Sequence, residues 1–317
     1  MHINRSNDDN KHHTTIQLLP TNDETIICHK RKRGTLEIIV GKLSGFCFGV
    51  ENAVKKANEI LEIEPATCLG ELVHNRQVIE KLEKKGLHTV EKIDEVPDNS
   101  KVIIRAHGIA KEVYEQAQKR NITINDFTCP KVLAIHKIAE RENKDSYIFL
   151  IGDKNHPEII GTSSFCGKDM DIIQEKEELK TAIENFKKSE KNKLYVIAQT
   201  TFSMEKFEDY AKYISNKLKE YDVKINNTIC DSTRLRQEEV EEISKAVDYV
   251  IIVGGKNSAN TQKLYNIAIK NCPSIHIQTK DDLNIEEIKK YNKIGISAGA
   301  STPKESIEEV VEMLERI

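Results

Sequence analysis

Three stretches of this sequence repeat one pattern: SGFCFGVENAV (44–54), DFTCPKVLAIH (126–136) and NTICDSTRLRQEEV (227–240). Each stretch places a cysteine directly before the start of a predicted helix, and these cysteines are Cys47, Cys129 and Cys230. Because the stretches are widely separated along the chain, they indicate an internal repeat. Repeats of this kind are supersecondary units that bury their apolar faces together.

The residues that follow each cysteine support the repeat. A polar residue follows after 27, 27 and 28 residues, and these are His74, His156 and Ser258. Three similar acidic pieces come next: VEKIDEV (90–96), QEKEEL (174–179) and QTKDDL (278–283). Strands that end in polar loops then follow, namely IIRAHGI (103–109), VIAQTTF (196–202) and ISAGAST (296–302). Each copy closes with a predicted helix, at 111–119, 203–219 and 303–315.

Short β-branched runs alternate with amphipathic helical segments along the chain. The runs are LEIIV (36–40), KVIIR (101–105), SYIFLIG (146–152), KLYVIA (193–198), YVIIVGG (249–255) and KIGISAG (293–299). This alternation predicts an α/β fold with mostly parallel sheets. We expect three similar lobes about a pseudo-threefold axis, with bounds 35–126, 127–227 and 228–317. Residues 1–34 lack sustained apolar periodicity, so we expect a disordered N-terminal extension.

The composition excludes several classes of protein. The chain has 317 residues, 38% of them hydrophobic, and a formal net charge of −3, which gives no overall field for nucleic acid. No apolar run is long enough for a membrane span or a secretory signal, so we expect a cytoplasmic protein that binds neither membrane nor nucleic acid. The seven cysteines form no C-x-x-C pair, and their odd number disfavours disulfides and favours thiolate or metal chemistry.

The repeat also predicts where the site lies. Open parallel sheets bind ligands at the carboxyl ends of their strands, so three lobes around one axis direct the three cysteine loops into one central cavity. Three thiolates from distant loops suit an iron-sulfur cluster whose fourth iron stays free to bind substrate. The alternative is that these are ordinary buried cysteines. We expect that second outcome for the cysteines outside the repeat register, which are Cys28, Cys68, Cys166 and Cys272.

Polar residues occupy the other loops, nearly all just before a predicted helix. They are His74, His107, His156, Thr200, Thr201, Ser258, Asn260 and Ser301. Neutral donors at helix N-termini form a phosphate or diphosphate site, although a single Ser, Thr or Asn is also a usual helix cap. Glu158, the one carboxylate in these positions, is either a proton donor or an ordinary glutamate of a first helical turn. No G-x-G-x-x-G motif is present, so we expect no bound flavin or nicotinamide.

The sequence also resembles the 4-hydroxy-3-methylbut-2-enyl diphosphate reductase family, over about residues 36–317. Nine motifs carry the resemblance: SGFCFGV, ELVHNR, RAHGI, FTCP, HPEIIGT, AQTT, ICDSTRLRQE, VGGKNSAN and SAGASTP. It implies one 4Fe-4S cluster at the centre of the lobes, held by Cys47, Cys129 and Cys230. It also implies that the diphosphate is held by His74, His107, His156, Ser258, Asn260 and Ser301. Thr200 and Glu158 would serve the substrate hydroxyl and deliver the proton.

This resemblance implies a reductase that forms isopentenyl and dimethylallyl diphosphate in the last step of the methylerythritol phosphate pathway, with ferredoxin or flavodoxin as electron donor. Ala259 stands where many relatives have a second serine, so one hydrogen bond to the diphosphate is lost or made by water, at about 1 kcal/mol. Residues 1–34 match no part of the family pattern. Two alternatives remain open: a quinolinate-synthase-like iron-sulfur dehydratase that acts on carboxylates, and a non-catalytic iron-sulfur sensor.

Overall fold

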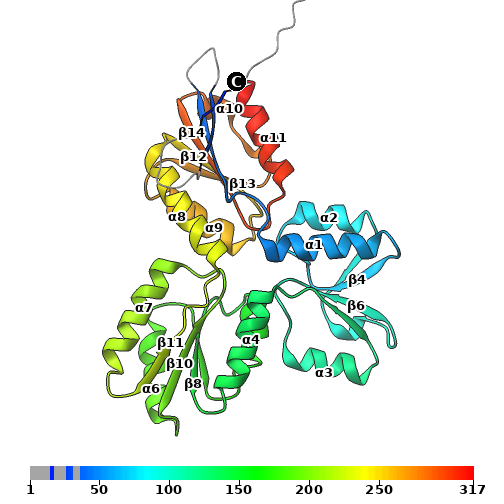
Figure 1. Cartoon of the computed structure of the whole chain (residues 1–317), viewed down its shortest axis with the longest axis vertical. Coiled ribbons are helices and arrows are strands. Elements are labelled where there is room, and N and C mark those ends of the chain that lie inside the picture. Colours follow the sequence, from blue (N-terminus) through cyan, green and yellow to red (C-terminus); the bar gives the residue numbers. More distant parts are fainter. Residues whose placement is uncertain (1–14, 18–25, 31–35) are drawn as a thin grey trace, which may run out of the picture.

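A computed structural model of the chain describes residues 15–17, 26–30 and 36–317, and gives side chains for 36–317. It contains three lobes, each a sheet covered by helices, arranged around a common centre (Figure 1). The α/β class and the three-lobed arrangement that the repeats predict are therefore confirmed. Within the described residues, no helix is both long enough and apolar enough to span a membrane.

Each lobe is built on one sheet. The first sheet consists, in order, of β5 (Leu87–Val90), β4 (Ala66–Leu69), β6 (Lys101–Ile104) and β7 (Thr123–Asp126). The second consists of β11 (Asp222–Ile225), β10 (Lys193–Ala198), β8 (Tyr147–Ile151) and β9 (Met170–Ile173). The third consists of β1 (Thr15–Gln17), β2 (Ile26–Lys30), β3 (Glu37–Gly41), β14 (Lys293–Ala298), β12 (Tyr249–Val253) and β13 (Ser274–Ile277). All pairs are parallel except β1 with β2 and β2 with β3.

Helices connect the strands and cover the sheets. In the first lobe they are α1 (Phe48–Leu61), α2 (Arg76–Glu83), η1 (Ile93–Glu95) and α3 (Lys111–Lys119). In the second they are α4 (Pro130–Glu142), α5 (Pro157–Ser163), α6 (Glu178–Lys188) and α7 (Met204–Lys217). In the third they are α8 (Asp231–Ala246), α9 (Ala259–Ala268), η2 (Lys280–Asp282), α10 (Ile285–Ile288) and α11 (Lys304–Glu315).

Central strands and helix stripes form the cores of the lobes. Every residue of β8 and of β12 is buried, as expected for parallel strands covered on both faces. The helix α7 buries Phe207, Tyr210 and Ile214, which recur at the spacing of one helical face. Burial of a side chain of this size contributes about 1.5–3 kcal/mol, so apolar periodicity alone is enough to fix which face each helix turns inward.

The lobe bounds expected from the sequence need one correction. Residues 36–40 were expected to open the first lobe, but β3 pairs in parallel with β14 and is part of the third sheet. In Figure 1 this blue strand lies beside orange strands from the other end of the chain. Each cysteine loop therefore leads out of one sheet into the next lobe, because β3, β7 and β11 precede Cys47, Cys129 and Cys230.

The N-terminal extension also differs from the expectation. Residues 26–30 form β2, which pairs antiparallel with β3 over five residues, and β1 pairs with β2 in turn. The structure describes strands at these two segments, whereas the expectation of disorder for the rest of residues 1–34 lies outside the described residues. A parallel sheet leaves the amide and carbonyl groups of its edge strand unpaired, and an added strand satisfies them without any strong apolar pattern of its own.

Candidate active site

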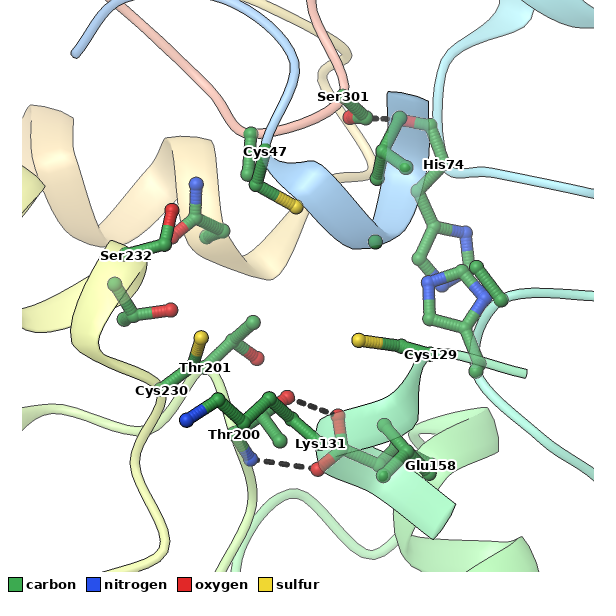
Figure 2. A pocket seen from close by; sticks show the side chains of 18 of the residues that line it. Cys47, His74, Cys129, Lys131, Glu158, Thr200, Thr201, Cys230, Ser232 and Ser301 are labelled. Carbon is green, nitrogen blue, oxygen red and sulfur yellow. Dashed lines mark hydrogen bonds between the residues drawn. The ribbon is translucent and has the colours of Figure 1, made fainter. Parts of the chain in front are cut away.

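The three repeated cysteines are the N-cap residues of three helices. Cys47 precedes α1, Cys129 precedes α4 and Cys230 precedes α8, and none of the three thiols makes a capping hydrogen bond. Their sulfur atoms face a common space where the lobes meet (Figure 2). Three helix N-termini thus direct their positive dipole ends toward three partly exposed thiols, an arrangement that favours an anionic group bound between them.

One cavity contains all of these groups. It measures about 770 Å³, a figure that includes space open to solvent, and it is lined by residues of all three lobes. The structure brings together all eleven residues expected at the site with roles in metal, substrate or proton binding, with His107 and Thr200 among the lining residues. Thr201 and Ala259 line the cavity as well.

A glycine beside the thiols keeps part of this cavity open. Gly49 is buried in the first turn of α1, and a Cβ atom at this position would lie 2.6 Å from the Sγ atom of Cys129. Real Cβ atoms essentially never come that close. The absence of a side chain at Gly49 therefore leaves the Cys129 sulfur free to bind a group in the cavity, which fits a cluster held by thiolates.

Three histidines gather on one side of the cavity. The ring centroids of His74 and His107 are 4.1 Å apart, and that of His156 lies 5.4 and 5.5 Å from them. Burial lowers the pKa of His74 to about 4 and that of His156 to about 3, and the charge of Arg105 acts in the same direction. Burial also lowers the pKa of His107 well below its usual range. All three rings are therefore neutral at pH 7.

The hydrogen bonds of these rings indicate what they offer to a ligand. The Nδ1 atom of His156 accepts a hydrogen bond from the Glu158 amide at 3.1 Å, so in the neutral ring Nε2 carries the proton and donates. The Nδ1 atom of His107 is buried and has no hydrogen-bond partner. The three nitrogens nearest one another lie within 4.8 Å, a spacing that also suits a metal ion. Neutral rings with one N–H each fit an anion equally well.

The third lobe adds a hydroxyl and amide edge to the same cavity. Ser258 caps α9 by accepting a hydrogen bond from Thr261, and Ser301 donates to the carbonyl of His74 at 3.0 Å. Both side-chain atoms of Asn260 are buried without a partner. Buried amides are rarely left unpaired in folded proteins, so Asn260 indicates a bound polar ligand at this edge.

Glu158 and Thr200 form a buried pair in the cavity wall next to His156. The Thr200 amide donates to Oε1 at 2.6 Å, and its hydroxyl donates to Oε2 at 2.5 Å (Figure 2). Glu158 is only 2% exposed, and burial raises the pKa of its carboxyl group while the two hydrogen bonds from Thr200 oppose that rise. A buried carboxyl group with a raised pKa that lines a cavity is suited to hold and deliver a proton near neutral pH.

The other cysteines whose side chains are described do not line the cavity. Cys68 is buried in β4 and Cys166 is buried after α5, and burial raises the pKa of each thiol to about 12. Cys272 is partly buried beside Ser274. Cys28 lies in β2, where side chains are outside the described residues.

The sequence reasoning missed several residues at or beside the site. Lys131 and Ser232 line the cavity. Lys263 does not line it but donates a hydrogen bond to the carbonyl of the lining residue Thr201. Arg236 is buried next to the loops of Cys47 and Cys230. Lys131, Ser232 and Arg236 follow a repeated cysteine by two to six positions, so the first two turns of the cysteine-capped helices were the available signal.

Comparisons with known proteins agree on one family. A family model described as LytB protein matches residues 38–315. A protein of Clostridioides difficile strain 630 named 4-hydroxy-3-methylbut-2-enyl diphosphate reductase is 41% identical over 285 residues, 89% of this chain and 100% of the relative. A protein of the same name from Campylobacter jejuni strain RM1221 is 39% identical over 281 residues, 88% of this chain and 98% of the relative.

Two solved structures are similar over most of the chain. The E-1-hydroxy-2-methyl-but-2-enyl-4-diphosphate reductase from Plasmodium falciparum has a TM-score of 0.81 and 31% identity, covering 89% of this chain and 88% of that one. A structure of (E)-4-hydroxy-3-methyl-but-2-enyl diphosphate reductase, described as the terminal enzyme of the non-mevalonate pathway, has a TM-score of 0.65 and 36% identity. It covers 88% of this chain and 99% of that one.

Proposed function

The chain belongs to the LytB protein family, and from this membership we infer that it reduces 4-hydroxy-3-methylbut-2-enyl diphosphate to isopentenyl diphosphate and dimethylallyl diphosphate. The reaction takes up two electrons and two protons and releases the allylic hydroxyl as water, at the end of the non-mevalonate pathway. One observation carries this proposal: three thiols, three neutral histidines and the Glu158–Thr200 pair line a single cavity.

Cys47, Cys129 and Cys230 are the proposed ligands of one 4Fe-4S cluster. Their thiols come from three lobes and face one space, and the bare Gly49 leaves the Cys129 sulfur accessible. A bound cluster with three protein ligands supplies electrons and an iron with a free position. The chain itself supplies the fixed sulfur positions and three helix N-termini that favour negative charge at this point.

The diphosphate binds at the three-histidine side of the cavity. The N–H groups of His74, His107 and His156 and the unpaired amide of Asn260 provide donors, with Ser258 and Ser301 beside them. These residues come from all three lobes, so one bound anion contacts every lobe. Fixing the diphosphate also fixes the position of the hydroxyl at the other end of a short C5 chain, an orientation effect that removes part of the activation barrier.

Glu158 and Thr200 handle the proton. The protonated carboxyl group donates to the hydroxyl that leaves as water, and the two hydrogen bonds from Thr200 stabilise the carboxylate that remains. Burial raises the pKa of this carboxyl group and favours its protonated form, whereas the hydrogen bonds from Thr200 favour the carboxylate.

The electron donor is a second proposed element. The sequence carries no dinucleotide motif, so the two electrons come from a redox protein, a ferredoxin or flavodoxin, and not from a nicotinamide or flavin bound by this chain. The cytoplasmic location that the sequence predicts also stays a prediction.

The test is an anaerobic assay of purified protein. With dithionite-reduced viologen and the hydroxylated diphosphate, we expect brown protein with about four irons per chain to form the two C5 diphosphates. Colourless protein with stoichiometric zinc and no turnover would refute the proposal. A thermal-shift comparison separates the alternatives, because a ligand that binds only the folded state raises its stability. A shift with dicarboxylates and none with the C5 diphosphate would favour the dehydratase, and no shift with either would favour the sensor.

A further inference from the structure

Arg236 connects the loop before Cys47 to the first turn of the helix that Cys230 caps. It lies in α8 and is 4% exposed. Its Nη2 atom donates to the carbonyl of Gly45, two residues before Cys47, at 2.6 Å. Its Nη1 atom donates to the carbonyl of Ser232 at 3.3 Å and to the Ser232 hydroxyl, two residues after Cys230. One guanidinium therefore holds the loop that leads into α1 against the first turn of α8.

The positive charge of Arg236 has no close carboxylate. Among the described residues, no Asp or Glu oxygen makes an ion pair with it, and its Nε atom is buried without a partner. Glu239 acts on it from one turn away but accepts a hydrogen bond from the Leu43 amide at 3.2 Å, and burial raises the pKa of this carboxyl group. Burial of a cation without a carboxylate in ion-pair contact is unfavourable, so further negative charge nearby would stabilise the site.

A cluster bound by the sulfur atoms of Cys47 and Cys230 is the available source. Burial lowers the pKa of Arg236, while Cys47, Glu239 and Cys230 oppose this change and favour its charged form. A cluster held by thiolates carries net negative charge, and reduction adds one more negative charge at the same place. A fixed cation beside it stabilises the reduced form more than the oxidised form.

We propose that Arg236 is a positioning residue that holds two cluster loops together and provides the counter-charge that raises the cluster's reduction potential. This inference rests on the proposed function, since it requires the cluster. It makes two separable statements: the hydrogen bonds of the guanidinium retain the cluster, and its charge sets the potential.

The experiment compares three variants as anaerobic, cluster-loaded protein: Arg236→Gln, Arg236→Lys and Arg234→Gln. Arg234 is the matched control, because it carries the same charge on the same helix but is only half-buried and pairs with Glu238. The readouts are the midpoint potential from a spectroscopic titration and the rate of iron loss to a chelator, neither of which depends on turnover.

We expect Arg236→Gln to lower the ratio of reduced to oxidised cluster at a fixed potential about tenfold, a shift of about 59 mV for one electron. Arg236→Lys keeps the charge but loses the two-sided contacts, so its potential should stay near that of the parent while iron is lost faster. Arg234→Gln should match the parent in both readouts.

The outcomes separate the two statements from the proposed function. A potential for Arg236→Gln equal to that of Arg234→Gln would refute the counter-charge. Parent-like iron retention in both Arg236 variants would refute the loop contact. If both Arg236 variants lose iron equally fast, the loop contact is supported, and the counter-charge is judged from the potentials measured directly after loading, where a potential for Arg236→Lys as low as that for Arg236→Gln would refute it. A parent protein without iron would overturn the proposed function itself, and this inference with it.

Discussion

Replacement of Glu158 by Gln separates chemistry from binding at this site. The glutamine oxygen can accept from the Thr200 amide as Oε1 does now, at 2.6 Å. Its NH₂ group can donate to the Thr200 hydroxyl, which accepts in place of its present donation to Oε2. The variant therefore keeps the shape and both hydrogen bonds of the buried pair and loses only the transferable proton.

The expected loss is confined to the rate of the chemical step. Removal of a general acid lowers kcat by about 10²- to 10⁴-fold, which corresponds to about 2.7–5.4 kcal/mol of activation free energy. The Glu158 side chain contacts Thr200, and its backbone amide, which donates to His156, is unchanged in the variant. KM and substrate affinity should therefore change by less than about threefold, as for loss of a transition-state interaction.

The assay is steady-state reduction with viologen, with iron content measured in the same samples. Glu205→Gln is the matched control, because Glu205 is also a first-turn glutamate but is exposed on α7 and pairs with Lys270. Turnover of Glu158→Gln within about threefold of the parent, with the cluster intact, would refute the role of Glu158 in proton delivery. Glu158 would then be an ordinary glutamate near a helix N-terminus.

The same variant has a pH signature in stability. Burial raises the pKa of Glu158, so the folded state binds this proton more tightly than the unfolded chain, whose glutamate titrates near about 4.3. The parent therefore loses stability as pH rises from that value toward the folded-state pKa, and glutamine does not titrate. Over this pH range, the free energy of unfolding of Glu158→Gln should therefore rise relative to that of the parent. A difference independent of pH would contradict the raised pKa.

Three further predictions concern the cluster, the diphosphate and the extension. Serine in place of Cys47, Cys129 or Cys230 should abolish the brown colour and most bound iron. The control Cys166→Ser should keep both, because its hydroxyl can donate to the Thr162 carbonyl that the thiol now contacts at 3.4 Å. Replacement of His74 by Asn should raise KM about tenfold or more with a smaller effect on kcat, because it removes a donor to an anion present before and during the reaction; equal losses in kcat and kcat/KM would contradict this. Deletion of residues 1–33 should leave iron content and kcat within about twofold of the parent. It should lower Tm, because β3 loses its partner β2 and becomes an edge strand. Loss of activity with the cluster intact would assign the extension a role in the reaction.

The sequence by itself determined the local elements and the repeat. The six apolar runs predicted as strands correspond to β3, β6, β8, β10, β12 and β14, and the three closing helices correspond to α3, α7 and α11. These features depend on neighbouring residues, through apolar periodicity and helix starts. The repeat placed each cysteine before a helix, and the structure places each at an N-cap. The convergence of three lobes followed from the repeat because parallel strands turn their carboxyl ends to one side.

Only the tertiary structure decided which strands share a sheet and how charges are placed. The pairing of β3 with β14 joins residues from opposite ends of the chain, and the local pattern of β3 is equally compatible with either sheet. The raised pKa of the Glu158 carboxyl group and the neutral histidines arise from burial beneath elements distant in sequence. The contact of Arg236 with Gly45 spans 191 residues. Secondary structure is a property of short segments, whereas desolvation and strand partnership depend on which segments come together in space, so periodicity cannot encode them.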